Sequence, residues 1–549
     1  MKATFNLIDE PWIPCVPIDG GPTAERSIAE VLTNASAYRE IYDNSPLVTV
    51  SLHRLLLAIL HRVRGPKNLG EARALAREGL PVEAIRSYLD RWRDRFDLFD
   101  EQHPFYQTAN LETGKMKRNK KGAEWVAEPM SVIRLANEAP DKNQPALFDH
   151  RAYFNDESML PADAARHLVA AQSYALSSSQ SSNARVNGKD VGRPEKLGCT
   201  QCPGIEGVWC WLCGADLGET LLLNLVPQQA NPSDVAAWEM TDPLKEMRRS
   251  WAERQLPAGI ADRYTWQTRM IRLVPDWHFH ELVVPRIFFT QGRSPQTYDD
   301  DPMSAYARGK ESDPWDSISL RRDKAAWRDS HALLTSGPRV RQPQAVNHVA
   351  AMVESGALTA DDYALHIAGI ARGKEAAKQI LWRHDRFPAP MALLKDADLA
   401  ERLGTMLQSS EIAGKGLNAS CRVLCANYLV PGFDMMAKDK QRELLRPNPK
   451  HPTDIDCLSK EIDPRRSYWA RMEGHFYALL RELPADKDAA SERWRAAVER
   501  EAKKAFKESA DQLGQSARAI RARALVNPSL RPRANNACNG ESNQKEVIA

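Results

Sequence analysis

Four long helical patterns near the end of the chain constrain its fold most. Residues 389–411, 413–436, 465–483 and 488–525 each repeat apolar side chains at a spacing of three and four residues. An amphipathic helix must bury its apolar stripe, and four successive stripes favour a bundle. We therefore predict a C-terminal four-helix bundle over residues 386–528, followed by a polar, disordered tail over residues 529–549.

The preceding 385 residues show no single periodicity. Short apolar runs favour strands near residues 207–212, 269–273 and 281–290, and the polar stretch 110–145 is expected to be a long loop. The fold class predicted is α+β, predominantly α, with an irregular mixed N-terminal domain that contains short strands. Helices are expected at residues 51–65 with Ser51 as N-cap, twice within 68–100, at 160–176, and over most of 316–337, 343–355 and 359–382.

Composition excludes two broad classes of protein. The chain has 549 residues, of which 43% are hydrophobic and 27% charged, with a formal net charge of +3, so it can bury a large core and is not disordered overall. No run approaches the roughly 18 apolar residues that a membrane helix needs. The N-terminus carries no export signal, and the expected location is the cytoplasm.

Four of the nine cysteines lie within fifteen positions, as two CxxC pairs: Cys199, Cys202, Cys210 and Cys213. Two such pairs can place four thiolates around one tetrahedral Zn²⁺, and four cysteine ligands leave no open position for a substrate. The sequence thus predicts a structural zinc knuckle over residues 199–213. The alternative is that residues 209–214 form a plain strand, which would point Cys210 and Cys213 to opposite faces.

A second group of polar residues could hold a catalytic metal, but an exposed strand edge beside a solvated acidic turn is the favoured interpretation. The segment WHFHE would put His278 and His280 on one face of a strand, and Asp299, Asp300 and Asp301 follow soon after. No complete metallonuclease pattern surrounds them, and no Walker A, GxGxxG or GxSxG motif occurs. This favours a binding subunit over an enzyme, with a metal-dependent nuclease as the alternative.

Basic residues offer a possible contact with nucleic acid. The run from Lys115 to Lys121 and the Lys and Arg residues of the last helical pattern could neutralise phosphates. Solvated loops and helix faces carry such charges equally well. Charge alone therefore leaves both interpretations open.

A series of short motifs along the chain resembles those of one known family. The opening NLIDEPWIPC, residues 6–15, is similar to the N-terminal signature of the CasA family, the large subunit of the type I-E CRISPR complex Cascade. Further resemblance lies in QHPFYQT (102–108), NQPALFDH (143–150), GETLLLNLV (218–226), which matches a strand of the family, YTWQTRMIRL (264–273) and DPMSAY (301–306). Together these motifs span nearly the whole chain.

The resemblance implies a non-enzymatic role in recognising double-stranded DNA. A family member reads the short PAM, helps to open the duplex for guide pairing and R-loop formation, and recruits the nuclease that degrades the target. The implied partners are double-stranded DNA, the guide CRISPR RNA complex, its backbone, guide-5′-end-capping and small subunits, and a helicase-nuclease or a nuclease domain on another subunit. A third possibility is a zinc-stapled scaffold whose DNA contacts are incidental.

The resemblance also assigns residues. It places a loop that contacts the guide and the DNA at Leu147, Phe148, Asp149 and His150. The counterpart of the family's glycine loop lies within 177–183, at Ser178, Ser179 and Asn183. The basic finger falls at Arg269 or Arg272, and the wedge lies within 372–375, at Gly373, Lys374 and Glu375. The glycine loop is mainly serine here, and Lys374 and Glu375 stand where the family often has an amide. A zinc at the CxxC pairs would brace the base of the serine loop.

Overall fold

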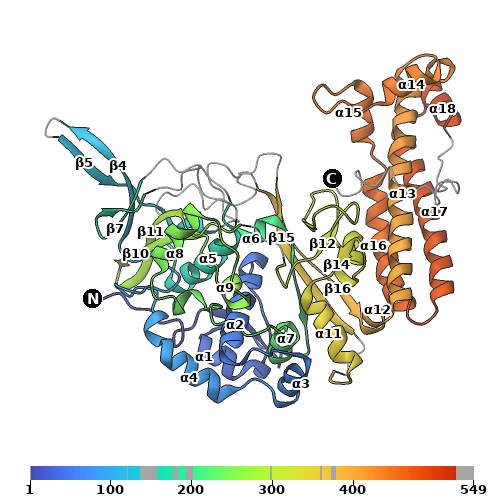
Figure 1. The fold of residues 1–549 in the computed structure, drawn as a ribbon. Coiled ribbons are helices and arrows are strands. Elements are labelled where there is room, and N and C mark those ends of the chain that lie inside the picture. Colours follow the sequence, from blue (N-terminus) through green and yellow to red (C-terminus); the bar gives the residue numbers. More distant parts are fainter. Residues whose placement is uncertain are drawn as a thin grey trace. The chain divides into compact units, whose positions relative to one another are not determined.

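A computed structural model describes residues 2–119, 122–136, 158–176, 183–192, 202–296, 300–358, 362–372 and 379–526. The chain divides into two compact units, Met1–Phe387 and Pro388–Ala549 (Figure 1). The division falls two residues after the boundary expected at residue 385. The first unit mixes helices with small sheets and the second is helical, so the fold is α+β.

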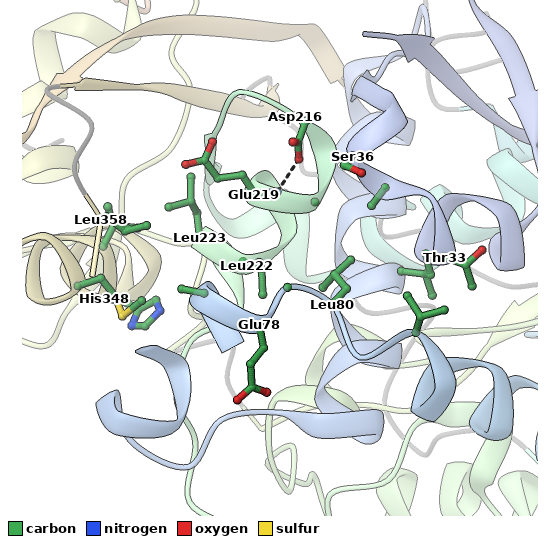
Figure 2. A pocket seen from close by; sticks show the side chains of 18 residues that line it. Thr33, Ser36, Glu78, Leu80, Asp216, Glu219, Leu222, Leu223, His348 and Leu358 are labelled. Carbon is green, nitrogen blue, oxygen red and sulfur yellow. Dashed lines mark hydrogen bonds between the residues drawn. The ribbon is translucent and has the colours of Figure 1, made fainter. Parts of the chain in front are cut away.

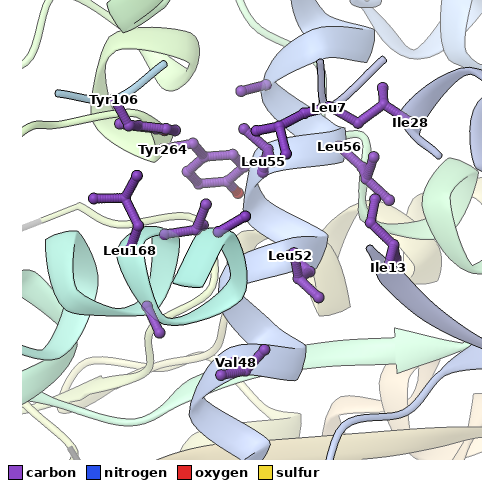
Figure 3. Packing of buried hydrophobic residues seen from close by; sticks show 14 of the residues in the cluster. Leu7, Ile13, Ile28, Val48, Leu52, Leu55, Leu56, Tyr106, Leu168 and Tyr264 are labelled. Carbon is purple, nitrogen blue, oxygen red and sulfur yellow. The ribbon is translucent and has the colours of Figure 1, made fainter. Parts of the chain in front are cut away.

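The core of the N-terminal unit is built around α2 (Pro46–Arg64). The Ser45 side chain caps this helix by accepting a hydrogen bond from the Val48 amide at 3.2 Å, and Pro46 occupies its first turn. Helix α2 packs against α5 (Pro161–Tyr174) and α9 (Ile260–Tyr264). Its Leu52, Leu55 and Leu56 are buried, and Figure 3 shows Leu56 on the side of Ile13 and Ile28. The predicted N-cap Ser51 is wrong, because Ser51 lies inside the helix and its hydroxyl donates to the Leu47 carbonyl.

Helix α2 is also the one helix in the described part of the chain that is long and apolar enough to cross a membrane. In this fold 78% of its most apolar window is buried inside the protein. A buried core helix passes the same test of length and composition, so this is weak evidence for a membrane span.

The remaining helices of the unit are short and cover the sheets. Both helices expected within residues 68–100 form, as do those expected at 160–176 and 343–355. In chain order the other helices are α1 (Ile28–Thr33), α3 (Leu69–Glu78), α4 (Val82–Trp92), α6 (Pro203–Glu206), α7 (Leu217–Asn224), α8 (Pro243–Ala252), α10 (Ser330–Leu334) and α11 (Gln344–Glu354). The GETLLLN segment, expected as a strand by resemblance, forms α7.

Within the described residues the strands form five small sheets. Their orders are β2-β1-β3, β10-β11-β6, β13-β12-β14, β16-β15-β9 and β5-β4-β7-β8. The strand bounds are β1 (Ile13–Pro17), β2 (Ala24–Arg26), β3 (Tyr38–Ile41), β4 (Leu111–Asn119), β5 (Gly122–Ala127), β6 (Met130–Ser131), β7 (Asn183–Val186), β8 (Lys189–Asp190), β9 (Trp209–Cys213), β10 (Arg269–His278), β11 (Glu281–Gln291), β12 (Tyr306–Ala307), β13 (Asp316–Ser317), β14 (Val340–Arg341), β15 (Asp362–Arg372) and β16 (Gln379–Pro390).

Three further predictions of local structure in this unit are wrong. Residues 111–119 and 122–127 form the paired strands β4 and β5 where a long loop was expected, and residues 362–372 form β15 where a helix was expected. Within 316–337 only Ser330–Leu334 is α-helical. Strand β15 forms because it pairs with β9 along five residues, from Ala364 opposite Cys213 to Ala368 opposite Trp209. Such pairing over a long sequence separation overrides local propensity.

A buried ion pair joins several elements of this core. Arg54 of α2 donates two hydrogen bonds of 2.9 Å to the Asp301 carboxylate, and both side chains are nearly inaccessible to water. The Arg54 guanidinium lies 3.7 Å from the ring centre of Trp209 and 4.2 Å from that of Tyr264. The Met303 amide donates to the same carboxylate at 3.0 Å. Helix α2 is thereby tied to β9, to α9 and to the loop before β12.

The C-terminal unit is organised by α13 (Ala397–Leu429). This single helix of 33 residues replaces the two helices predicted over 389–411 and 413–436. It packs on α16 (Arg465–Glu482), α17 (Lys487–Asp511), α15 (Asp454–Glu461) and α18 (Ala517–Ala524), while α12 (Met391–Lys395) and α14 (Lys438–Leu445) flank it. The indole of Trp494 donates to the Met406 carbonyl at 2.8 Å between α17 and α13. The predicted tail, 529–549, lies outside the described residues.

We expect Asp301→Asn to destabilise the N-terminal unit by about 3–5 kcal/mol, because it leaves the buried Arg54 charge without its counter-ion. Urea unfolding followed by tryptophan fluorescence measures the change. The matched control is the neighbouring Asp300→Asn, which removes an exposed pair with Arg341 and is expected to cost less than about 1 kcal/mol. Equal losses for the two variants would contradict the role assigned to the pair.

Candidate nucleic-acid interface

Several predicted site residues lie outside the described part of the chain. These are Leu147, Phe148, Asp149, His150, Ser178, Ser179, Gly373, Lys374, Glu375, Cys199 and Asp299. Their assignments stay predictions. The described structure does place Asn183, Arg269 and Arg272, the other three cysteines, both histidines of the WHFHE segment and two of the three acids.

Arg269, one candidate for the basic finger, is a buried structural residue. It begins β10 with no accessible surface. Its guanidinium donates to the carbonyls of Thr268, Ala175 and Leu176 at 2.9, 3.1 and 3.0 Å. Ala175 and Leu176 directly follow α5, so Arg269 satisfies carbonyls at the C-terminal end of that helix. A side chain held in this way does not reach a DNA groove.

Arg272, the other candidate for the finger, is partly buried. Its Nη1 donates to the Leu111 carbonyl at 3.2 Å, and its guanidinium lies 5.7 Å from the ring centre of Phe288. The side chain therefore links β10 to the start of β4. Neither arginine occupies the exposed end of the β10–β11 hairpin.

The exposed end of that hairpin is aromatic. Phe279 and His280 form a two-residue turn with φ of 48° and 70°, and the Phe279 side chain is 90% exposed. Trp277 is also exposed, and the rings of His278 and Phe279 lie 4.5 Å apart. Bulky residues rarely adopt positive φ, and such strain concentrates at functional sites. The two histidines flank a turn, so the prediction that they share one strand face is wrong.

The acidic run does not complete a catalytic metal site. Asp301 is paired with Arg54, and Asp300 forms an ion pair with Arg341. Burial alone would raise the pKa of Asp301, but the Arg54 guanidinium holds that pKa below its ordinary value. Across the described residues no group of three or more His, Cys, Asp or Glu side chains could hold a metal ion. The described geometry therefore does not favour the nuclease alternative.

The described cysteines do not fit one four-cysteine zinc site. Cys210 and Cys213 both lie in β9, where a separation of three residues points side chains to opposite faces. The Cys202 sulfur lies 2.8 Å from the Thr268 hydroxyl. Burial raises the pKa of Cys213 to about 12 and raises that of Cys210 as well, which disfavours the thiolate that zinc requires.

Three histidines surround Trp211 beside a small cavity of about 200 Å³. His366 Nδ1 lies 3.0 Å from His384 Nε2, and the His384 ring stacks on the indole at 13°. Burial lowers the pKa of His53 to about 4 and that of His366 to about 3, so both are neutral near pH 7. Cys213 also lines this cavity, yet the ring nitrogens and the thiol do not form a metal-binding group among the described residues.

A larger cavity of about 510 Å³ lies between α1, α7 and α11 (Figure 2). Leu80, Leu222 and Met352 contribute to its apolar wall, and Glu78, Asp216 and Glu219 supply carboxylates. Asp216 is already engaged as the N-cap of α7. None of the predicted site residues that the structure describes lines this cavity.

Asn183 is the predicted DNA-contacting residue that the structure places on an accessible sheet. It begins β7 and pairs with Gly114 of β4 in the sheet that carries the β4–β5 hairpin. Figure 1 shows this hairpin projecting from the N-terminal unit. The basic run that was expected in a loop therefore lies mainly on a hairpin whose strands have defined faces.

The fold places the chain in a class of solved CRISPR-associated proteins. The crystal structure of CasA from Thermus thermophilus superposes with a TM-score of 0.74 and 26% identity, covering 95% of this chain and 97% of that one. A chain of a CRISPR RNA-guided surveillance complex superposes with a TM-score of 0.72 at 20% identity, covering 94% and 98%. The second likeness concerns the fold alone.

Sequence comparison identifies the family. The family model for CRISPR-associated protein Cse1 matches residues 6–505. CasA/Cse1 of Thermus thermophilus is 30% identical in a match of 533 residues that covers 94% of this chain and 95% of that protein. The chain belongs to the CRISPR-associated Cse1/CasA family. The resemblance stated from the motifs is confirmed.

We expect Arg269→Ala to destabilise the N-terminal unit by about 2–4 kcal/mol, because three buried carbonyls lose their donor. Urea unfolding measures this loss. Phe279→Ser, at the exposed end of the same hairpin, is the control and is expected to change stability by less than about 0.5 kcal/mol. An Arg269→Ala variant of unchanged stability with weakened DNA binding would restore the finger assignment.

We expect purified chain to contain far less than one zinc per molecule, because Cys210 and Cys213 lie on opposite faces of β9 and burial raises the pKa of both thiols. Metal analysis by mass spectrometry checks this. Zinc at one equivalent that disappears in both Cys202→Ser and Cys213→Ser would instead support the zinc knuckle predicted from the CxxC spacing.

Proposed function

We propose that this chain is the non-catalytic large subunit of a type I-E CRISPR RNA-guided surveillance complex in the cytoplasm. The observation that carries this proposal is the match to the Cse1 family over residues 6–505. In this role the chain recognises the PAM in double-stranded DNA, promotes duplex opening and R-loop formation, and recruits or licenses the nuclease that degrades the target.

The proposed partners follow from that role. Within the complex the chain contacts the guide RNA assembly through its backbone, guide-5′-end-capping and small subunits. The nuclease is a recruited helicase-nuclease or a domain on another subunit. The loop Leu147–His150, the serines Ser178 and Ser179 and the wedge Gly373–Glu375 remain the proposed DNA and guide contacts, each on the basis of its resemblance to a family motif.

The geometry shifts the proposed finger from Arg269 to the hairpin tip. Arg269 anchors the base of the β10–β11 hairpin, whereas Trp277 and Phe279 are exposed at its far end. A rigid hairpin ending in an exposed aromatic ring suits insertion beside a base step, which unstacks the duplex. We assign the contact with opened DNA to Phe279, supported by Trp277 and His278.

The first test compares the guide-RNA complex assembled with and without this chain. Duplexes carry a matched protospacer and varied flanking trinucleotides, and gel-shift titration measures their binding. We expect discrimination among flanking sequences only when the chain is present. Binding that ignores the chain would overturn the proposed function. Mg²⁺- or Mn²⁺-dependent cleavage by the isolated chain would favour the nuclease alternative.

We expect Phe279→Ala to weaken binding of a PAM-containing target by about tenfold, because loss of one aromatic–base contact costs about 1–3 kcal/mol. Permanganate reactivity of unpaired thymines near the PAM should fall with it. The Phe279→Trp variant keeps an aromatic ring and should retain most of the binding. If Phe279→Ala opens and binds the target like the wild type, the tip is not the finger.

A further inference from the structure

The sheet β5-β4-β7-β8 has one face turned away from the core. Antiparallel partners place their side chains on the same side, and Met116 pairs with Trp125, Arg118 with Ala123 and Gly114 with Asn183. Arg185 pairs with Glu112 on that same side. We call this side the outer face; its accessible residues used below are Met116, Arg118, Trp125, Asn183 and Arg185.

Arg185 is held on the outer face by a stack. Its guanidinium carbon lies 4.2 Å from the ring centre of Trp125, and its Nη2 lies 3.7 Å from the Met116 sulfur. Gly114 makes room for the indole, because a Cβ there would meet a ring carbon of Trp125 at 3.0 Å and the Val126 carbonyl oxygen at 2.2 Å. A planar cation fixed over an aromatic ring loses little further freedom when it binds.

The opposite face carries charges that are already compensated. Lys115 and Lys117 lie 3.2 and 3.9 Å from the Glu128 carboxylate. Nearer the base this face is buried, with Leu111 and Val186 packed in a core cluster that includes Phe288. The two lysines of this face are therefore paired with a carboxylate, and the buried base of the face belongs to a hydrophobic core.

The outer face carries two arginines and two acids, so its formal charge is balanced. Glu112 and Asp190 are the register neighbours of Arg185 on the two adjacent strands. Neither Arg118 nor Arg185 forms an ion pair with any residue that the structure describes, and the Arg185 guanidinium lies on Trp125 instead. Both guanidinium groups therefore keep hydrogen-bond donors that no described carboxylate takes up.

We propose that the outer face binds the sugar-phosphate backbone of the target DNA. Arg118 and Arg185 contact phosphates, Asn183 supplies a polar contact, and Trp125 is a positioning residue that keeps the Arg185 guanidinium in place. Phosphate is the chemistry that a planar, two-pronged donor held in place by a stack fits. A protein partner would require a larger apolar centre than the single exposed Met116. The inference rests on the proposed function and names a surface for it.

The test uses the assembled guide-RNA complex and, separately, the isolated chain with a duplex that lacks a protospacer. Affinity is measured from about 50 to about 200 mM salt. We expect Arg185→Ala to weaken both interactions by about three- to tenfold and to reduce the salt slope by about one. Arg118→Ala should act similarly, and the opposite-face control Lys115→Ala should change neither affinity nor slope by more than about a fifth of that effect.

A second set of variants tests Trp125 as a positioning residue. Trp125→Ala should lose about as much affinity as Arg185→Ala, and the double variant should lose no more, because both changes remove the same contact. Trp125→Phe keeps a ring under the guanidinium and should restore most of the affinity. Arg185→Lys should keep the salt slope while losing affinity. Melting temperatures verify that each variant is folded.

The outcomes separate this inference from the proposed function. If the wild-type complex shows no PAM dependence, the proposed function fails, while the isolated chain still tests the outer face against non-specific duplex. If PAM dependence is present and Arg185→Ala and Trp125→Ala bind both DNAs like the wild type, the outer face is not a DNA contact. Equal losses for Lys115→Ala and Arg185→Ala would also overturn it, since charge alone would then explain the binding.

Discussion

The bidentate pair between Arg54 and Asp301 is the interaction on which the N-terminal unit depends. Removing two charges from water is costly, and here the cost is offset by two hydrogen bonds of 2.9 Å, by two aromatic rings and by the Met303 amide. Because the pKa of Asp301 is lowered by folding, its contribution is complete above the ordinary aspartate pKa and is lost as pH falls through the lowered value. The ion pair between Arg54 and Asp301 therefore persists in mild acid and is lost only when the pH falls below the ordinary pKa range of aspartate.

Much of the helical structure could be predicted from the sequence, and much of the sheet structure could not. Helix α5 begins at Pro161 and repeats buried residues at helical spacing, so local signals suffice. Strand β15 contains Leu365 and Ile367 in alternation, but its neighbours also satisfy a helical pattern, and pairing with β9 and β16 decides between them. The outer half of β4, from Lys115 to Arg118, is exposed at four successive positions because both faces of the hairpin are solvated there. Such a polar run without alternation resembles a loop in the sequence.

The candidate site was likewise predictable only in part. Ordered motifs suffice to identify the family, because they depend on residue identity along the chain. The role of an individual residue depends on its burial, which is a property of the tertiary structure. Arg269 is a basic residue in the motif expected to hold the finger, yet its guanidinium donates hydrogen bonds to carbonyls at the C-terminal end of α5. The aromatic turn at Phe279 does not stand out in the sequence, where His278 and His280 are expected on the edge of an exposed strand. A two-residue turn between two apolar runs was the signal that could have revealed it.

Helix α13 gives the C-terminal unit a fixed dimension. At 1.5 Å per residue its 33 residues extend about 50 Å without a break, which is the length of about 15 base pairs of B-form DNA. A continuous helix packed on α16 and α17 resists bending and compression far better than the two shorter helices that the sequence suggested. The helix therefore fixes the separation between the two ends of the unit at about 50 Å.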